Sequence, residues 1–406
     1  MNVGLFTDPY YPIVDGVSNS VGMLKAALEG LGHEVHVFTT TNPLVDHEEM
    51  NVHRSVSMPF LLLPSRRVGM PYNPKAVHLV RQLKLDVVHT HTEFTMGTFG
   101  MAMAKNLRKP LVHTYHTLYE DYSHYWTKGI KYFEKPSRKA VRALSRTYCN
   151  ACDRVIVPTG KTRDLLNRYE VQTPIVTIPT GLPLERFKRE NIDAGEVARL
   201  RSQYGIGSDD KVILFIGRIA KEKQLEDLFE VMPEFMMAHE NVKFLLVGDG
   251  PWRSIIEEVV AAKDMTHRVV FAGEQPYASI GGFYQLGDVF INASQTETQG
   301  LTYLEAMAAG VPVLAREDKC LEGVIESGVS GVTFMTVQEV SGHLEKLLFD
   351  DDWRGLIRAN AGEVVRAFSA HAFAQKVEAV YQDVLSDVRD GKIRKSVVED
   401  EIEKEV

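Results

Sequence analysis

Residues 288–315 constrain the fold more than any other part of this chain, because their pattern is that of a strand, a loop, a helix and a second strand. The run 288–292 has an apolar centre, which predicts a buried strand. A helical spacing of apolar residues begins after Gly300 and stops at Gly310, and a short apolar run follows at 312–315. The segment predicts an α/β protein that binds a ligand at the carboxyl ends of its strands.

Two carboxylates lie in this segment, Glu297 in the loop and Glu305 in the helix. Gly300 lets the backbone approach a ligand closely. The N–H groups of Leu301 and Thr302 then begin the helix, where unpaired donors and the helix dipole suit a phosphate. Acids beside a phosphate accept hydrogen bonds from hydroxyls, so we expect Glu305 on a ribose and Glu297 on a sugar. A solvated helix face is the alternative explanation of this spacing.

The same alternation of strands and helices runs through the chain in two series. We predict strands at 3–7, 34–39, 86–90, 110–114, 154–158 and 175–179, and then at 212–216, 242–247, 269–272, 288–292 and 312–315. A chain of 406 residues is long enough for two domains. The prediction is an α/β protein with two Rossmann-like, doubly wound parallel-sheet domains: 1–186 with a helix at about 370–388, and 187–369, followed by a charged tail at 392–406.

Composition favours a globular protein without a membrane span. The chain is 44% hydrophobic and 25% charged, and no run approaches the ~18 apolar residues of a spanning helix. The N-terminus lacks the basic and apolar regions of a signal peptide, so we expect a cytoplasmic location. Cys149 and Cys152 have the spacing of a zinc or redox pair, but without a second pair buried thiols are favoured.

The charge is divided unevenly. Residues 1–186 hold 22 Lys and Arg against 16 Asp and Glu, and residues 187–406 hold 24 against 38. Because cations are in excess in the first half, we expect that half to bind an anionic partner.

Two cations follow the first strand of the second series. Arg218 and Lys223 lie in the loop after the strand at 212–216, where they suit a diphosphate leaving group whose charge they would neutralise. A helix is predicted to follow at 225–232. Two ordinary surface cations are the alternative.

The first loop of the chain offers a weaker phosphate contact. Gly16, between Asp15 and a predicted helix from Ser18, could let the backbone approach a phosphate from the opposite domain. An ordinary turn is the alternative, and the glycine-rich dinucleotide fingerprint is absent here.

Histidines cluster at predicted strand ends. His113 and His116 end the strand at 110–114, and His89 and His91 form a similar pair. A histidine facing a cleft can hydrogen-bond a sugar hydroxyl or a phosphate, although a structural role is the common alternative. Metal ligation is not expected, because no third ligand lies nearby.

A basic helix that begins at Pro136 is predicted in the first domain. One stripe of cations, with aromatic residues just upstream, suits a helix that lies flat on anionic lipid. A solvated basic face is the alternative, and nothing resembling a base-reading module supports nucleic acid. The cations expected to bind the membrane are Lys128, Lys131, Lys135, Arg138, Lys139, Arg142 and Arg146.

These motifs together resemble one family over essentially the whole chain, the retaining GT-B glycosyltransferases of family 4. The Glu297/Glu305 pair resembles the EX7E motif of that family, and Gly217-Arg218 with Glu222-Lys223 resembles its phosphate-binding loop. Within the family, the chain is most similar to bacterial 1,2-diacylglycerol 3-α-glucosyltransferases. The segments that carry the narrower match are 4–8, 92–94, 113–117, 119–122 and 296–303.

The resemblance implies two domains facing a cleft, with a UDP-sugar in the C-terminal one and the acceptor in the N-terminal one. It implies Arg218 and Lys223 on the diphosphate, Glu305 on the ribose, Glu297 on the donor sugar, and Gly16 on the phosphate from across the cleft.

His116 matches the active-site histidine of the family. Acceptor contacts are then expected from His116, Glu120 and Asp121. No metal is expected for the chemistry, and stimulation by Mg²⁺ is left open.

The activity implied is transfer of glucose from UDP-glucose to the hydroxyl of 1,2-diacylglycerol, on the inner face of the cell membrane. UDP-galactose as donor remains open, as do a monoglycosyl-diacylglycerol, a polyprenyl-linked intermediate or a soluble acceptor. A regulator that only binds a nucleotide-sugar is the non-enzymatic alternative.

Overall fold

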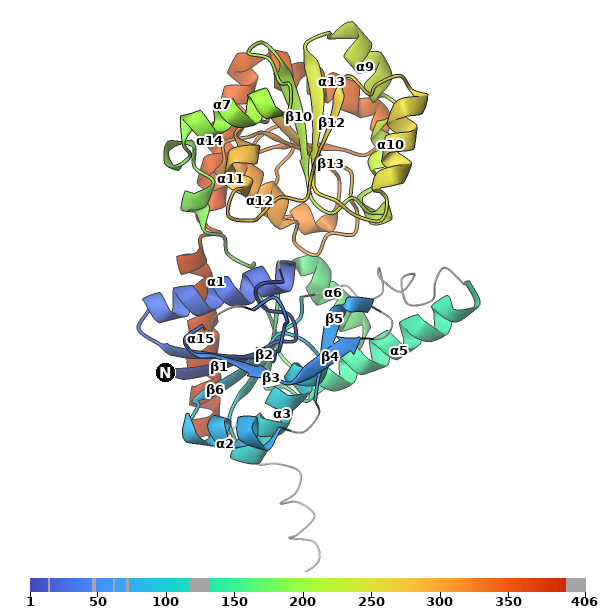
Figure 1. Cartoon of the computed structure of the whole chain (residues 1–406). Coiled ribbons are helices and arrows are strands. Elements are labelled where there is room, and N and C mark those ends of the chain that lie inside the picture. Colours follow the sequence, from blue (N-terminus) through green and yellow to red (C-terminus); the bar gives the residue numbers. More distant parts are fainter. Residues whose placement is uncertain (14, 46–48, 61–62, 71–72, 117–130, 392–406) are drawn as a thin grey trace, which may run out of the picture. The chain divides into compact units, whose positions relative to one another are not determined.

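The computed structural model of the chain describes residues 1–13, 15–45, 49–60, 63–70, 73–116 and 131–391. The chain forms two compact units (Figure 1). The first consists of Met1–Gly181 together with the residues from Ala370 onward, and the second is Leu182–Ser369. Each unit has its own sheet and core.

The first unit is built on a sheet of seven parallel strands in the order β3-β2-β1-β6-β7-β8-β9. Its strands are β1 (Asn2–Phe6), β2 (Glu34–Thr40), β3 (Val52–Ser55), β6 (Val87–Thr90), β7 (Leu111–Thr114), β8 (Arg154–Val157) and β9 (Ile175–Thr177). A separate antiparallel pair is formed by β4 (Ser57–Phe60) and β5 (Leu63–Gly69). The order reverses between β1 and β6, as in a doubly wound fold.

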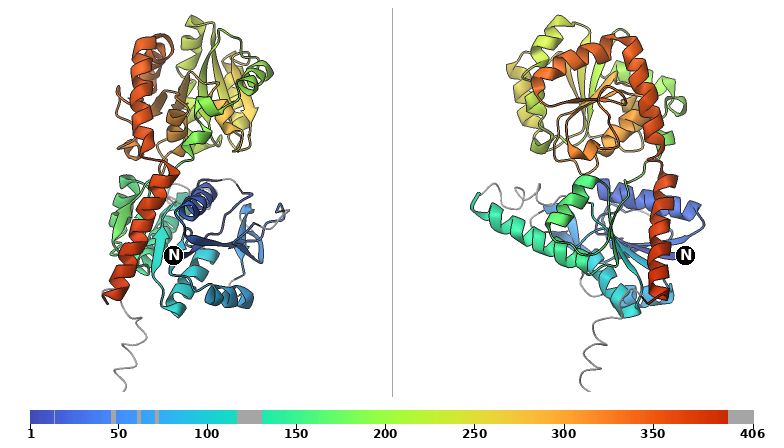
Figure 2. Two further views of the ribbon diagram at one scale, coloured as in Figure 1. Left: turned by 90° about the vertical axis from the view of Figure 1, so that its left-hand side faces the viewer. Right: turned by 180° about the vertical axis from the view of Figure 1, so that it is seen from behind.

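Helices cover both faces of this sheet (Figures 1 and 2). They are α1 (Gly16–Gly30), α2 (Pro74–Gln82), α3 (Thr95–Leu107), α5 (Lys131–Asn150), α6 (Gly160–Arg168) and α15 (Ala370–Arg389). One buried cluster joins α1 and α15 to alternate strand residues such as Val3 and Leu5, and another joins α3, α5 and α6 to their neighbours, such as Phe6 and Val88. The helix α15 comes from the far end of the chain, so the core of the first unit closes only with that helix.

The second unit has six parallel strands in the order β12-β11-β10-β13-β14-β15. They are β10 (Lys211–Ile216), β11 (Val242–Val247), β12 (Val269–Gly273), β13 (Val289–Asn292), β14 (Val313–Arg316) and β15 (Val332–Phe334). The helices are α7 (Ala194–Gln203), α8 (Leu225–Leu228), α9 (Met232–Ala238), α10 (Arg253–Ala262), α11 (Ile280–Tyr284), α12 (Leu301–Ala308), α13 (Val340–Phe349) and α14 (Asp351–Arg366).

The strands of this unit are buried on both faces, as parallel strands usually are. Residues such as Phe215 and Phe244 pack into one cluster with α8, α9, α10 and α13. On the other face, the ring of Phe290 lies 6.0 Å from Tyr284 of α11 and 6.1 Å from Tyr303 of α12. The sheet therefore holds α12 against a rigid core, together with the two predicted functional features of that helix: the N–H groups at its start and Glu305.

The first and last residues of the second unit lie side by side. The N–H of Leu182 donates to the carbonyl of Phe368 over 2.8 Å, and Leu182 also forms a parallel bridge with Ser369. The sequence-based boundary followed Arg186, whereas the second unit begins at Leu182.

The predicted α/β architecture is confirmed. All eleven predicted strands are also confirmed, and each predicted end lies within two residues of the observed one. The strands β3, β4, β5 and β15 were not predicted. One predicted helix, 225–232, is wrong: α8 ends at Leu228 and α9 begins anew at Met232. Pro233 lies in the first turn of α9, where it cannot donate the bond that would continue the earlier helix.

Two helix starts also differ from the prediction. The basic helix was expected to begin at Pro136, since proline favours a first turn, but α5 already begins at Lys131. The first helix was expected from Ser18, but α1 begins at Gly16. The carboxylate of Asp15 accepts from the N–H of Ser18 over 2.8 Å, and this cap places the helix start two residues earlier.

Candidate active site

The strand order of the second unit reverses between β10 and β13, which pair directly. In open α/β sheets, ligands bind at the carboxyl ends of the strands at such a point. The loop after β10 carries Arg218 and Lys223, and the loop after β13 carries Glu297. The structure therefore brings three predicted site residues to one edge of the sheet.

Backbone packing holds the loop after β10 in place. Gly248 has φ 137°, and a Cβ at this position would lie 1.9 Å from the carbonyl oxygen of Gly217. The N–H of Ile219 donates to the carbonyl of Asp249 over 2.9 Å. Because the loops after β10 and β11 touch backbone to backbone, Arg218 extends from a fixed turn.

Each of the two cations has a carboxylate partner. Arg218 forms an ion pair with Glu222, and Lys223 forms one with Glu297 from the other loop. The hydroxyl of Ser294 donates to the carbonyl of Glu222 over 3.2 Å, which joins the two loops again. The sequence predicted cations for a diphosphate but not these pairings.

The environment of Glu297 keeps it ionised. Burial raises its pKa, but the Lys223 ammonium and hydrogen bonds from Ser294 and Asn292 outweigh burial and hold the pKa below its usual value. The amide of Asn292 lies 3.5 Å from Oε1 of Glu297, and its own carbonyl oxygen accepts from the N–H of Ser294 over 2.9 Å. A negative charge is thus fixed beside the two cations.

The helix α12 begins in the way the sequence predicted. Gly300 precedes it with φ 68°, and a Cβ there would lie 2.3 Å from the ring of Tyr303. Both the left-handed backbone and the close ring require glycine. Among the described residues, no side chain caps this helix and none in its first turn is acidic. The N–H groups of Leu301 and Thr302 therefore form a helix start suited to an anion.

Glu305 is more enclosed than the sequence suggested. It is 6% exposed, and its two carboxylate oxygens accept from two phenols: Oε2 from Tyr284 over 2.7 Å and Oε1 from Tyr277 over 3.2 Å. Burial raises the pKa of Glu305, and the two phenols oppose that rise. Sequence reasoning missed both tyrosines, because no local spacing connects them with the acid.

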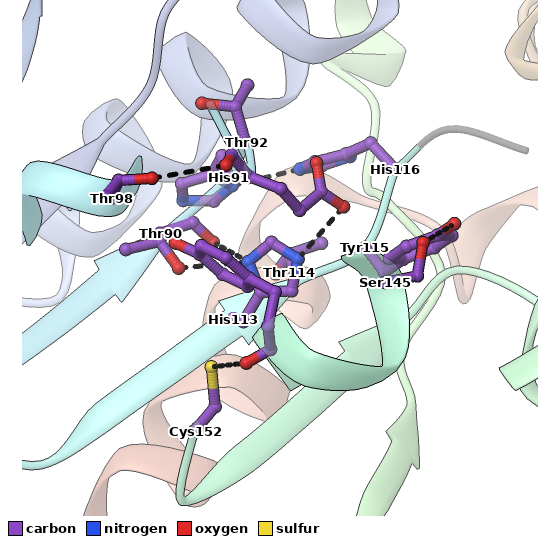
Figure 3. A network of polar contacts seen from close by, with 12 residues as sticks. Thr90, His91, Thr92, Thr98, His113, Thr114, Tyr115, His116, Ser145 and Cys152 are labelled. Carbon is purple, nitrogen blue, oxygen red and sulfur yellow. Dashed lines mark hydrogen bonds and ion pairs between the residues drawn. The ribbon is translucent and has the colours of Figure 1, made fainter. Parts of the chain in front are cut away.

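In the first unit, β6 and β7 end in a network of polar side chains (Figure 3). His89 is wholly buried, with Nδ1 2.7 Å from the Tyr381 hydroxyl and Nε2 2.7 Å from Oγ1 of Thr114. Burial holds the pKa of His89 well below its usual value. Its two ring nitrogens are satisfied inside the unit, which gives it a structural role.

His116 lies at the open end of this network. Its Nε2 is 3.0 Å from Nδ1 of the buried His91 (Figure 3). Burial, reinforced by His113, lowers the pKa of His116 to about 3. At neutral pH the half-buried ring is uncharged, so it offers a hydrogen bond and not a positive charge.

His113 lies behind His116 and is fully buried. Its Nδ1 is 3.0 Å from the carbonyl of Thr90, which can only accept, so Nδ1 carries a hydrogen. Its Nε2 is 3.4 Å from Oε1 of Glu93. The predicted pair is thus divided: His116 is partly exposed, and His113 supports the sheet edge.

The remaining acceptor and phosphate candidates lie in two places. Gly16 is the first residue of α1, and a Cβ at this position would meet no atom within 4 Å. Packing therefore does not explain a glycine here. Glu120 and Asp121 lie outside the described residues.

The basic helix is α5, and three of its cations are described. Lys139, Arg142 and Arg146 are exposed, but Glu170 pairs with Arg142 at 3.3 Å and with Arg146 at 2.9 Å. Leu144 is 47% exposed, but it lies about 200° around the helix from Arg142 and Arg146, on another face. Lys128 and the side chains of Lys131, Lys135 and Arg138 lie outside what the structure describes. The described face is therefore basic, and one acid, Glu170, partly offsets its charge.

Three further features bear on the alternatives. Cys149, Cys152 and Cys320 are buried thiols, as the sequence favoured. Within the described ranges, no group of three or more His, Cys, Asp and Glu is arranged to hold a metal ion. No helix in that part of the chain is both long and apolar enough to cross a bilayer.

Two family models match the chain: Glycosyltransferase Family 4 over residues 14–186 and Glycosyl transferases group 1 over residues 196–364. The alpha-monoglucosyldiacylglycerol synthase of Acholeplasma laidlawii is 35% identical over 95% of this chain and 98% of its own length. The synthase of the same name from Streptococcus pneumoniae is 36% identical over 95% of this chain and 86% of its own.

Among solved structures, Anabaena HepE in complex with UDP and glucose superposes with a TM-score of 0.74 at 17% identity, covering 94% of this chain and all of that one. WaaG, a glycosyltransferase involved in lipopolysaccharide biosynthesis, superposes with a TM-score of 0.68 at 16% identity, covering 94% of this chain and 99% of that one. The solved structures share the fold, and the synthases share sequence along nearly the whole chain. This chain therefore belongs to the glycosyltransferases of family 4 and has the GT-B fold.

Proposed function

We propose that this chain is a retaining glucosyltransferase that moves glucose from UDP-glucose to the free hydroxyl of 1,2-diacylglycerol. The bond between the anomeric carbon and the diphosphate breaks, a bond to the acceptor oxygen forms on the same face, and the acceptor proton leaves with the phosphate. The observation that carries the proposal is the Lys223–Glu297 ion pair beside the uncapped start of α12, at the reversal of the sheet. The names of the two synthases supply the acceptor.

The donor site can be assigned group by group. Arg218, Lys223 and the start of α12 neutralise the charge that develops on the departing diphosphate. An ammonium has three donors and a guanidinium five, so each cation can keep its carboxylate partner and still bind a phosphate oxygen. Glu297, ionised at neutral pH, accepts from a sugar hydroxyl, and Glu305 accepts from the ribose.

The acceptor side belongs to the first unit. His116 is uncharged and partly exposed, which suits a hydrogen bond to a hydroxyl on donor or acceptor. Glu120 and Asp121 stay candidates for acceptor contacts on the family resemblance alone. Gly16, with open space where its side chain would be, stays a candidate for a phosphate contact.

The test is a donor and acceptor screen with mass spectrometry of the lipid products. Vesicles with and without diacylglycerol are incubated with UDP-glucose or UDP-galactose, and separate reactions offer monoglucosyl-diacylglycerol, a polyprenyl phosphate or a soluble sugar. The expected product is α-monoglucosyl-diacylglycerol, formed only with UDP-glucose and diacylglycerol. Preferential use of another donor or acceptor overturns the substrate assignment, and no UDP release with any acceptor overturns the enzymatic proposal.

We also propose that α5 docks the protein on the anionic inner face of the cell membrane, since diacylglycerol does not leave the bilayer. Lys139, Arg142 and Arg146 are exposed and lie on one face of α5. Each well-placed cation contributes about 1 kcal/mol near an anionic surface, so the full stripe gives reversible binding.

Charge reversal tests this docking. Replacing Lys139, Arg142 and Arg146 with Glu is expected to abolish sedimentation with vesicles that contain phosphatidylglycerol. The matched control reverses three exposed cations of the second unit, Lys263, Arg358 and Arg366, with the same change in net charge. Equal loss in both variants indicates a general charge effect and contradicts docking through α5.

A further inference from the structure

Two phenols from separate elements converge on the one carboxylate of Glu305. Tyr284 ends α11 and is wholly buried, and Tyr277 lies in the loop between β12 and α11. The phenol of Tyr284 donates to Oε2 over 2.7 Å, and the phenol of Tyr277 donates to Oε1 over 3.2 Å. Each carboxylate oxygen therefore has one fixed donor of its own.

Aromatic packing holds both phenols in position. The ring of Phe187 meets Tyr284 edge to face at 5.7 Å and Tyr277 edge to face at 6.4 Å. The guanidinium of Arg186 lies 4.9 Å above the ring of Tyr277. The rings cannot turn away from Glu305 without breaking these contacts, so the direction of both donors is set before any ligand arrives.

With two phenols bound, the carboxylate of Glu305 can still accept a fixed number of further hydrogen bonds. An ionised carboxylate has about four acceptor positions, two on each oxygen. The phenols take one on each oxygen, which leaves one on each. Two acceptors side by side match the two hydroxyls of a vicinal diol, whereas a single remaining acceptor would match one hydroxyl only.

We propose that Tyr277 and Tyr284 are positioning residues that align Glu305 to accept both hydroxyls of a ribose, so that this site selects ribonucleotide donors over 2′-deoxyribonucleotide donors. The inference rests on the proposed function, which puts a nucleoside diphosphate-sugar at this edge of the sheet. It goes further by assigning the selection of the pentose to two residues that hydrogen-bond to Glu305.

Electrostatics gives the tyrosines a second measurable effect. Burial raises the pKa of Glu305, and the two phenol hydrogen bonds lower it. Removing either phenol raises the pKa further, so Glu305 takes up a proton at higher pH. A protonated carboxyl loses acceptor capacity, and the acidic decline in donor affinity is therefore expected to move to higher pH in a Phe variant.

The experiment compares UDP with 2′-deoxy-UDP by calorimetry, from pH 5 to pH 8, in Tyr277→Phe, Tyr284→Phe and Glu305→Gln. Kinetics with UDP-glucose accompany the binding data. Each Tyr→Phe change is expected to weaken UDP binding about tenfold, which is the order of effect of one hydrogen bond to a charged group, and to raise KM with kcat nearly unchanged. The preference for UDP over 2′-deoxy-UDP is expected to become smaller. The loss of UDP affinity at acidic pH is expected to begin at a higher pH than in the wild type.

Tyr204→Phe is the matched control, because its phenol lies in the same unit and accepts a hydrogen bond from the amide of Gln275, at 3.4 Å. It is expected to behave as the wild type. Tyr277 is only half-buried, so the Tyr277→Phe variant can be measured even if Tyr284→Phe, at a fully buried position, loses stability.

The outcomes separate this inference from the proposed function. One outcome is that both Tyr variants keep the wild-type preference for UDP over 2′-deoxy-UDP and the wild-type pH dependence, while Glu305→Gln loses the preference. This outcome overturns the positioning role of the tyrosines and leaves the donor site intact. Unchanged preference in Glu305→Gln removes Glu305 from the ribose site and overturns this inference, whereas the proposed function is decided separately by the donor and acceptor screen.

Discussion

The ion pair between Lys223 and Glu297 is the contact on which the donor site depends most. Its members come from loops that follow β10 and β13, and Glu297 stays ionised because Lys223 and hydrogen bonds outweigh burial. Lys223→Ala is expected to lower kcat/KM for UDP-glucose about a hundredfold or more, since it removes a charge aimed at the leaving group and leaves Glu297 without its cation. Steady-state kinetics on diacylglycerol vesicles measures the loss.

The neighbouring cation provides the control for that measurement. Lys221 is exposed and lies 5.6 Å above the ring of Trp252. Lys221→Ala removes an equal charge two residues away and is expected to keep nearly full activity. Wild-type-like turnover in Lys223→Ala, or an equal loss in both variants, removes Lys223 from the diphosphate site.

His116 makes the stability of the protein depend on pH in a predictable direction. Its pKa in the folded state is about 3, below the value of about 6.5 expected for an unfolded chain. Between these values the unfolded chain binds more protons, so stability from this group is present above pH 6.5 and is lost as the pH falls toward 3.

Denaturant unfolding at several pH values tests this linkage. The variant His116→Gln is expected to flatten the dependence of unfolding free energy on pH by up to about 1.4 kcal/mol per pH unit within that window. Identical slopes in the variant and the wild type contradict a half-buried, neutral imidazole at this position.

Residues were predictable from the sequence where function follows local spacing. Glu297, Gly300 and Glu305 lie within one loop and one helix, so their order along the chain already predicts their arrangement. Tyr277 and Tyr284 precede Glu305 by 28 and 21 residues. Only the packing of α11 against β13 brings them to the acid, and no local pattern encodes that packing.

At the scale of elements, the start of α12 is set by one backbone conformation. Gly300 has φ 68°, and any Cβ would lie 2.3 Å from the Tyr303 ring. Gly300→Ala is expected to cost about 2 kcal/mol or more, from the left-handed backbone and the clash, and to weaken UDP binding because the helix start moves. Thermal unfolding and calorimetry measure the two effects.

A glycine inside another helix of the same unit serves as the comparison. Gly342 lies in α13, is exposed, and would place a Cβ in open space. Gly342→Ala is expected to stabilise the protein by about 0.5–1 kcal/mol, since alanine favours the helix. Destabilisation by both changes to the same extent contradicts a special role for Gly300.

The longer the run of apolar residues in a strand, the more accurately the sequence predicted that strand. The strands β10 and β11 each have five apolar residues and one lysine, and their bounds were predicted closely. The strand β15 has three residues, and β4 and β5 pair as a small antiparallel ribbon outside the main sheet. Such strands depend on a neighbour for their hydrogen bonds, so the local pattern is too weak to predict them.

At the scale of the whole molecule, the chain leaves the first unit at Gly181 and returns to it at Ala370. The returning helix α15 contributes six buried side chains to one core cluster of the first unit: Phe373, Ala374, Val377, Val380, Tyr381 and Val384. The hydroxyl of Tyr381 also lies 2.7 Å from Nδ1 of His89, inside the sheet edge that holds His116.

Truncation after Ser369 is therefore expected to unfold the first unit and spare the second. Burial of a large apolar side chain contributes about 1.5–3 kcal/mol, so the lost helix carries as much as the whole net stability of a domain, about 5–15 kcal/mol. The fragment 182–369 is expected to fold alone, since its ends already meet through the 2.8 Å bond between Leu182 and Phe368. Calorimetry of the full chain, the chain 1–369 and this fragment assigns each unfolding transition; a first-unit transition that persists in the 1–369 chain would show that α15 is not part of that core in solution.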